Sequence, residues 1–129
     1  IESGSNIGRR NHLYALNQIT IGARVLTAPN VYISDCTHEF SNPNIPIIDQ
    51  PVRALPPVTI GDGTWIGQGA CIIGCRIGRN CVIGANSVVL NDVADHSVVA
   101  GAPARLIRQF DPATQQWIKP KQNITDTNS

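Results

Sequence analysis

Residues 60–71 read Ile-Gly-Asp-Gly-Thr-Trp followed by Ile-Gly-Gln-Gly-Ala-Cys, so one six-residue pattern occurs twice in succession. Each unit starts with isoleucine and glycine, continues with two polar or turn-forming residues, and has a small residue in fifth place. Units that start with Ile-Gly recur along the chain at 7–8, 21–22, 60–61, 66–67, 77–78 and 83–84. A period of six fits neither an α-helix, which repeats every 3.6 residues, nor a hairpin strand, which alternates every two.

A six-residue period with turn-forming residues in every unit predicts short, flat strands joined by tight corners. Three such strands close a triangular coil. Successive coils stack as a parallel β-helix, because one coil cannot bury its own apolar face. In that stack Ile66 lies over Ile83, and Thr64 lies over Cys81, which becomes a small filler of the interior. The sequence therefore predicts an all-β fold of stacked hexapeptide coils, in a single domain that covers residues 1–129.

The composition fits this fold and argues against several other classes of protein. Hydrophobic residues make up 42% of the chain but aromatic residues only 5%, and such an aliphatic bias suits closely stacked strands. The net charge of +1 gives no basic surface for nucleic acid or for an anionic membrane. No secretory signal is visible and no apolar run reaches the roughly 20 residues that span a bilayer, so we expect a cytoplasmic protein. The chain starts at Ile1 and contains no methionine, which leaves open a longer native N-terminus.

Two stretches interrupt the repeat, and a third follows it. Residues 9–18 are expected to form a short irregular insertion or a lengthened corner. Residues 39–57 contain five prolines and no periodicity, so they are expected to form a long loop that leaves the scaffold directly after His38. Loops of this kind are usually functional or disordered. Residues 109–129 are expected to be a tail that caps the coil or contacts another subunit.

Three longer motifs in the chain carry a family resemblance. They are the runs at 21–31 (Ile-Gly-x-x-Val-Leu-x-Ala-Pro-Asn-Val), 58–67 (Val-Thr-Ile-Gly-x-x-x-Trp-Ile-Gly) and 98–108 (Val-Val-Ala-Gly-Ala-Pro-Ala-Arg-x-Ile-Arg). Together they resemble the hexapeptide-repeat O-acetyltransferases, which include the galactoside, maltose, xenobiotic and surface-polysaccharide acetyltransferases. The resemblance implies a left-handed β-helix and a homotrimer. It also implies that acetyl-CoA and the acceptor meet in clefts between neighbouring subunits.

The resemblance assigns the catalytic role to His38. In the family the catalytic histidine follows the Ala-Pro-Asn-Val corner at the mouth of the loop, and His38 matches that place. An acceptor hydroxyl becomes a good nucleophile when a base removes its proton, and a neutral imidazole, with an unperturbed pKa of about 6.5, suits that task. The resemblance implies direct transfer in a ternary complex, with backbone N–H groups of a corner stabilising the oxyanion. Without the motif, His38 would be interpreted as an ordinary surface histidine, as His12 and His96 are.

The resemblance also implies a donor site formed by five residues. Arg105 and Arg108 match arginines that lie near the adenosine phosphates of coenzyme A, where a guanidinium group suits a phosphate. Ala85 matches a position that lines the pantetheine groove, and Gln68 matches one at the thiol end. Trp65 matches the tryptophan of the cleft. The alternatives are a pair of solvated arginines and a structural tryptophan ring.

Three further residues are candidates for the acceptor site. Tyr14 and Asn17 resemble the segment that contacts the sugar in the galactoside branch, although their spacing to Ile21 is shorter here. Asp35 could orient His38 or cap its own turn. The predicted acceptor is a hydroxyl group of a sugar or of a similar small molecule. Its specificity is expected to depend on the two unpatterned stretches.

Other functions remain to be weighed against an O-acetyltransferase. N-acetylation of an amino sugar would use the same fold and a similar histidine. A zinc carbonic anhydrase needs converging histidines, two of them close in sequence, and His12, His38 and His96 include no such pair. The four cysteines lack the spacing of a zinc site, so we expect buried thiols in a reducing compartment and no metal. A non-catalytic β-helix that serves as an assembly module is the remaining alternative.

Overall fold

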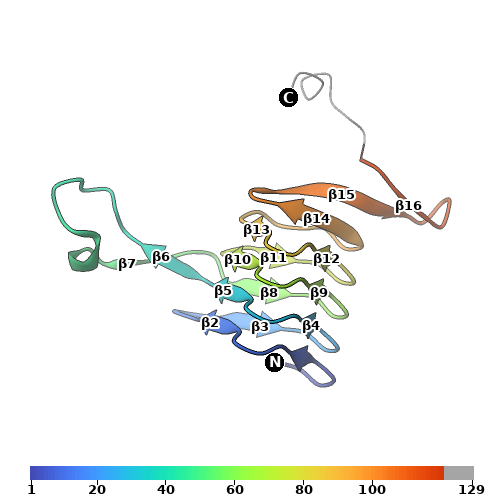
Figure 1. Cartoon of the computed structure of the whole chain (residues 1–129), viewed down its shortest axis with the longest axis horizontal. Helices are drawn as coiled ribbons and strands as arrows, with labels where there is room; N and C mark the ends of the chain where they lie inside the picture. The colour runs from blue at the N-terminus through green and yellow to red at the C-terminus, as the bar shows by residue number, and fades with distance from the viewer. Residues whose placement is uncertain (121–129) are drawn as a thin grey trace, which may run out of the picture.

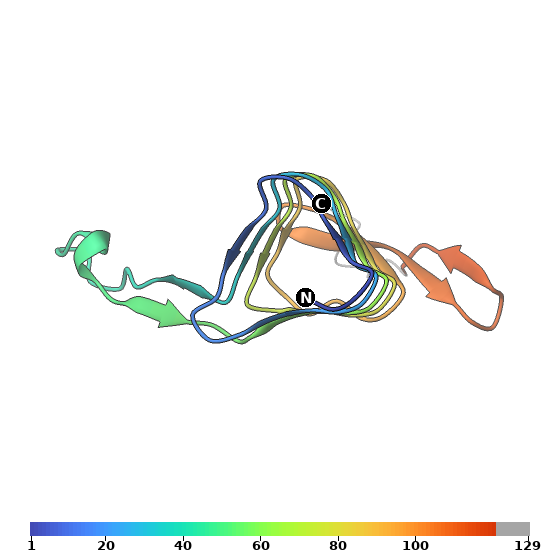
Figure 2. The ribbon, with the colours of Figure 1, turned by 90° about the horizontal axis from the view of Figure 1, so that it is seen from below.

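The computed structural model describes residues 1–120, which form a parallel β-helix of triangular cross-section. Viewed along the axis, the coils superimpose as nested triangles, and one long arm leaves the triangle at a corner (Figure 2). In the perpendicular view the coils stack from the N-terminus upward (Figure 1). The prediction of an all-β, left-handed parallel β-helix is confirmed.

Each side of the triangle is one parallel sheet. Sheet A contains β1 (Asn6–Ile7), β4 (Leu26–Thr27), β9 (Trp65–Ile66), β12 (Val82–Ile83) and β14 (Ser97–Gly101). Sheet B contains β2 (His12–Tyr14), β5 (Tyr32–Ser34), β10 (Cys71–Ile73) and β13 (Val88–Val89). Sheet C contains β3 (Ile19–Ile21), β8 (Val58–Ile60) and β11 (Arg76–Ile77). The chain visits A, B and C in turn, so we name the corners A–B, B–C and C–A after the sheets that they join.

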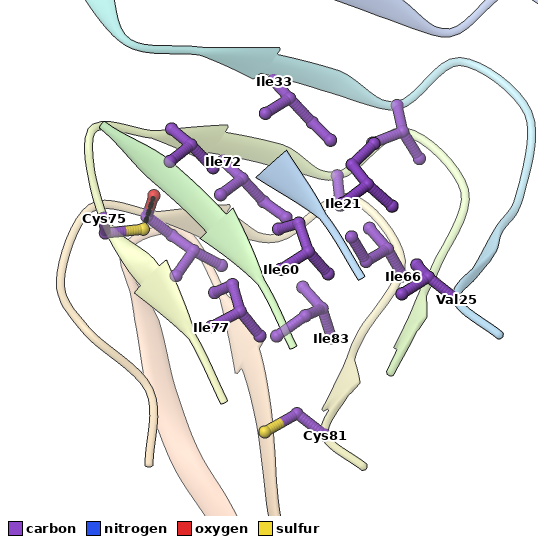
Figure 3. Packing of buried hydrophobic residues seen from close by; sticks show 14 of the residues in the cluster. Ile21, Val25, Ile33, Ile60, Ile66, Ile72, Cys75, Ile77, Cys81 and Ile83 are labelled. Atoms are coloured by element: carbon purple, nitrogen blue, oxygen red, sulfur yellow. Dashed lines mark hydrogen bonds between the residues drawn. The ribbon is translucent and has the colours of Figure 1, made fainter. Parts of the chain in front are cut away.

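The interior is filled by columns of side chains in register. Inward-facing residues stack as Thr27–Ile66–Ile83 on sheet A, Ile33–Ile72–Val89 on sheet B, and Ile21–Ile60–Ile77 on sheet C. They are buried, and their apolar members form one continuous core (Figure 3). The predicted stacking of Ile66 over Ile83 is confirmed. Burial of each such aliphatic side chain contributes about 1.5–3 kcal/mol, which explains why the repeat selects isoleucine and valine.

The corners select glycine and asparagine by backbone geometry. The C–A corner has φ between +48° and +75° at Gly4, Arg24, Gly63, Asn80 and His96, and the A–B corner has φ between +56° and +72° at Arg10, Asn30, Gly69 and Asn86. Glycine and asparagine tolerate this left-handed region best, which accounts for the fourth place of the repeat. The glycine in second place has another cause. A Cβ on Gly61 would lie 2.5 Å from the carbonyl carbon of Gly78 in the next coil.

The segment 9–18 is more regular than its sequence predicts. β2 pairs in register with β5, with Leu13 opposite Ile33, so it is one full side of the first coil. The prediction of an irregular insertion was therefore wrong for His12–Tyr14. Only residues 15–18 depart from the repeat, as a lengthened B–C corner.

The second interruption is an ordered arm that leaves the B–C corner after β5. β6 (Cys36–His38) and β7 (Val52–Ala54) pair antiparallel as its stem, and a short 3-10 helix, η1 (Ile47–Asp49), lies beyond them. The stem begins before the predicted loop of residues 39–57 and places His38 within a strand. The hexapeptide repeat does not predict this stem, because its pairing is local and antiparallel. Figures 1 and 2 show the arm extending away from the coils.

At the C-terminal end the chain turns back on sheet A. β15 (Ala104–Asp111) pairs antiparallel with β14, and β16 (Gln116–Ile118) pairs antiparallel with β15. The Phe110 ring packs against His96, at 6.2 Å between centroids, and against Trp117, at 5.6 Å. The part of the expected cap up to residue 120 corresponds to this hairpin. The rest of the expected cap, residues 121–129, lies outside the described residues.

Candidate active site

The predicted donor residues lie on sheet A and at the A–B corner. Trp65 belongs to an outward row of sheet A whose register partners run Leu26, Trp65, Val82, Val98 and Arg108. Its side chain is 49% exposed. Gln68 and Ala85 stack at the A–B corner of neighbouring coils, where the Gln68 carbonyl accepts the Asn86 N–H at 2.8 Å. The backbone N–H groups of Gln68 and Ala85 have no hydrogen-bond partner within residues 1–120. They are thus free to bind a ligand at this edge.

A β-bulge places Arg105 and Arg108 on the same outer face. In a regular strand a spacing of three would put them on opposite faces. The register shifts between Val98 and Val99, so that Arg105 pairs with Ala100 and Arg108 with Val98, both at outward positions of β14. Each guanidinium donates to the carbonyl of the preceding residue, at 3.1 and 2.9 Å. Their other N–H groups remain available for a phosphate.

The predicted acceptor residues lie at a different corner, B–C. Tyr14 ends β2, and Asn17 lies in the lengthened corner that follows. The Tyr14 ring, 58% exposed, lies against Tyr32 with centroids 5.9 Å apart. Tyr32 was not singled out from the sequence, although the register of β2 on β5 places it opposite His12, on the same outward face as Tyr14. His38 is exposed at the base of the arm, opposite Val52.

Asp35 is completely buried, and its carboxylate holds a corner of the first coil. One carboxylate oxygen accepts the N–H of Leu16 at 2.6 Å, and the other accepts those of Asn17 and Gln18 at 2.8 Å each. Burial acts to raise the pKa of Asp35, but these backbone donors outweigh it and lower the pKa below its usual value. Asp35 therefore caps the corner of the neighbouring coil, which is neither of the two predicted alternatives, the orientation of His38 and a cap of its own turn. Its complete burial argues against the direct acceptor contact that we predicted.

The structure keeps the donor and acceptor candidates apart. They occupy two corners of the triangle, with sheet B and its outward residues Tyr32, Cys71 and Val88 between them. A stack of close-packed, hydrogen-bonded coils is rigid, and the arm extends away from the triangle (Figure 2). Within one chain, the candidate donor residues and the candidate acceptor residues therefore do not meet.

The cysteines are free thiols at two kinds of position. Cys75 and Cys81 are buried, as predicted, whereas Cys36 and Cys71 are only half-buried. Burial raises the pKa of Cys75 to about 11, with the charge of Asp92 adding to the effect. No cluster of three histidine, cysteine, aspartate or glutamate side chains within residues 1–120 could hold a metal ion. The same part of the chain contains no helix of the length and apolar character needed to cross a membrane.

Known proteins share both the sequence pattern and the fold. Residues 57–91 match the family described as hexapeptide repeat of succinyl-transferase. The chain is 39% identical over 100 residues to the galactoside O-acetyltransferase of Escherichia coli K12, which covers 77% of this chain and 48% of that protein. The crystal structure of a maltose O-acetyltransferase from Clostridium difficile has a TM-score of 0.65 at 35% identity, and the match covers 84% of this chain and 60% of that one. This chain belongs to the hexapeptide-repeat acetyltransferase family.

This member of the hexapeptide-repeat acetyltransferase family is also similar to a structure that contains bound coenzyme A. A galactoside acetyltransferase solved in complex with coenzyme A has a TM-score of 0.62 at 25% identity, and the match covers 93% of this chain and 74% of that one. The chain spans about half the length of the Escherichia coli galactoside acetyltransferase, at 48%. The hexapeptide-repeat acetyltransferase family thus includes proteins longer than the chain described here.

Proposed function

We propose that this chain is the β-helix domain of an acetyltransferase that moves an acetyl group from acetyl-CoA to a hydroxyl of a sugar or a similar small molecule. Its relatives named for galactosides and maltose support this reaction, as does the coenzyme A bound by one of them. The main observation behind the proposal is that the candidate donor residues and the candidate acceptor residues form two separate groups on the β-helix. The residues expected to hold the donor gather on one edge, and those expected to hold the acceptor gather beside His38 at another.

The complete active site forms between two copies of the chain. The A–B corner of one copy faces the B–C corner and arm of the next, and a closed trimer has three such sites. Apolar surface is available on both sides of this contact. Sheet A has the outward row Leu26, Trp65, Val82 and Val98, and the arm exposes Phe40, Ile45, Ile47, Ile48 and Val52. Exposed apolar patches of this kind are typical of interfaces.

The chemistry is a direct transfer with His38 as general base. The imidazole takes the proton of the acceptor hydroxyl as the hydroxyl oxygen attacks the thioester carbonyl carbon. The free N–H groups at Gln68 and Ala85 supply donors along the donor edge, for the oxyanion or the pantetheine amides. When the carbon–sulfur bond breaks, the coenzyme A thiolate accepts the proton from the imidazolium. Arg105 and Arg108 hold the donor phosphates, while Tyr14 and Asn17 contact the acceptor.

A calorimetric titration with coenzyme A and acetyl-CoA tests the proposal. We expect saturable binding with one donor per chain, and thiol release when an acceptor is added. A panel of maltose, methyl β-galactoside and glucosamine separates hydroxyl from amino acceptors, since glucosamine would also yield an N-acetyl product. If a folded, oligomeric sample binds no donor, the chain is instead a non-catalytic assembly module. The use of acetyl-CoA and the free thiols support a cytoplasmic location.

A further inference from the structure

Asp35 lies at the junction between the coils and the arm. β5 ends at Ser34 and β6 begins at Cys36, so Asp35 is the single residue between the two strands. Its backbone N–H donates to the Tyr14 carbonyl at 3.3 Å, and its carbonyl accepts the N–H of Leu55 at 2.8 Å. Leu55 directly follows β7, the returning strand of the arm. Asp35 is therefore bonded through its backbone to both the first coil and the arm stem.

The side chain of Asp35 strengthens the same junction. Three consecutive backbone N–H groups, those of residues 16–18, converge on its carboxylate and form a small anion-binding nest. A fully buried carboxylate needs such donors, because an ionised group without partners is very costly to remove from water. The corner that it fixes is the one whose exposed side chains include Tyr14 and Asn17.

Other corners are held by weaker contacts of the same kind. Asp62 accepts one backbone N–H, that of Ala23, at 2.8 Å, and Asp95 accepts that of Arg79 at 2.8 Å. Both aspartates are exposed at the C–A corner. Among the described corners, a buried carboxylate with three backbone donors occurs where the acceptor candidates meet the arm. This position indicates a role beyond ordinary corner capping.

We propose that Asp35 is a positioning residue for the acceptor half-site. It joins the corner that carries Tyr14 and Asn17 to the base of the arm that carries His38, so that the three groups keep a fixed arrangement. Asp35 does this without touching the acceptor. The inference rests on the proposed acetyl transfer for its catalytic meaning, whereas the mechanical junction can be tested without it.

The first test measures amide hydrogen exchange in the wild-type chain and in Asp35→Asn. Asparagine keeps the size but removes the charge and turns one acceptor oxygen into a donor. We expect faster exchange at residues 16–18 and also at Glu39, whose N–H bonds to the Pro51 carbonyl within the arm stem. Asp62→Asn is the matched control and should change neither segment. If exchange becomes faster at residues 16–18 but the exchange rate at Glu39 does not change, Asp35 caps only its local corner, and the proposal is wrong.

Two further measurements protect the test against misfolding and against failure of the proposed function. Asp35→Glu keeps the charge and should give the same two-segment pattern at smaller amplitude, so it replaces Asp35→Asn if that variant does not fold. With acetyl-CoA and the fastest sugar of the panel, Asp35→Asn should lower kcat/KM for the sugar about tenfold or more, with a raised KM, since small misplacements are costly. The Kd of coenzyme A should stay within about twofold, because the donor residues lie at another corner.

The outcomes of these measurements are distinct. Equal losses of sugar kcat/KM and of coenzyme A affinity in Asp35→Asn would indicate a general loss of structure and overturn the positioning role. If the wild-type chain transfers no acetyl group to any sugar, the proposed function fails, and the exchange pattern alone then decides whether the junction exists.

Discussion

His38 is exposed in the stem of the arm, where it lies opposite Val52. We expect His38→Ala to lower the rate of acetyl transfer by about 10²–10⁴-fold, the usual contribution of a general base. The Kd of coenzyme A should not change, because the proposed donor residues lie on sheet A and at the A–B corner, away from the arm. Thiol release and calorimetry measure the two quantities. His96→Asn is the control, since asparagine tolerates the positive φ at that position, and an equal rate loss in both variants would contradict the assignment.

Because of Cys75, we expect the free energy of unfolding to vary with pH in the alkaline range. Burial raises the pKa of its thiol from 9.0 to about 11 in the folded chain. The neutral thiol is thus favoured by folding, and this contribution is complete below pH 9 and is lost as the pH rises toward 11. Urea unfolding at a series of pH values should show the free energy of unfolding falling over that interval. Cys75→Ala should flatten the fall, and a slope identical to that of the wild type would rule out this origin.

At the scale of the element, the corners impose the strictest requirement on sequence. Gly61→Ala places a Cβ 2.5 Å from the carbonyl carbon of Gly78, and backbone of the next coil cannot move aside easily. We expect the free energy of unfolding to fall by about 1–3 kcal/mol, the cost of overpacking. Arg79→Ala, at an exposed position of the facing corner, should change it by less than about 0.5 kcal/mol. Denaturant unfolding of both variants is the measurement, and equal stabilities would refute the close approach.

Elements that repeat the hexad could be predicted from the sequence, and elements that do not repeat it could not. The isoleucines of 60–71 predict the coil and its register, because each inward position recurs after six residues. β2 was not predicted because it contains no Ile-Gly pair. Its one inward residue, Leu13, stands between the bulky residues His12 and Tyr14, so the small and polar residues of the repeat are absent there. The bonds of Asp35 to residues 16–18 span one coil length, so knowledge of the β2 register would have indicated them.

The candidate site could be predicted as a set of residues more readily than as an arrangement. Motif matches selected Gln68 and Ala85, and the register then stacks them on one edge. The shared face of Arg105 and Arg108 depends on a bulge in β15, which no periodicity encodes. The stem of the arm likewise depends on antiparallel pairing between β6 and β7, flanked by prolines that usually argue against strands.

At the scale of the whole molecule, the stack presents each corner as a straight column. Strands in neighbouring coils lie about 4.8 Å apart, so an extended ligand along the A–B corner could contact Gln68, then Ala85, and then reach the arginines of β15. A long, narrow cofactor such as coenzyme A suits that geometry. The arm leaves from a different corner, B–C, and extends away from the triangle (Figure 2). In the proposed function, a second copy of the chain therefore supplies the acceptor side of the site.

Subunit mixing tests this requirement directly. His38→Ala chains keep the donor edge, and chains with Arg105→Ala and Arg108→Ala keep the arm, so each variant alone should be nearly inactive at low acetyl-CoA. When the two are co-refolded in equal amounts, about a quarter of the interfaces in a closed trimer pair an intact edge with an intact arm. Thiol release should therefore recover to about a quarter of the wild-type rate. Mixing His38→Ala with a chain that carries all three substitutions should restore nothing, because no intact histidine is present. If the first mixture also stays inactive while mixed oligomers form, both half-sites act within one chain and the inter-subunit site is wrong.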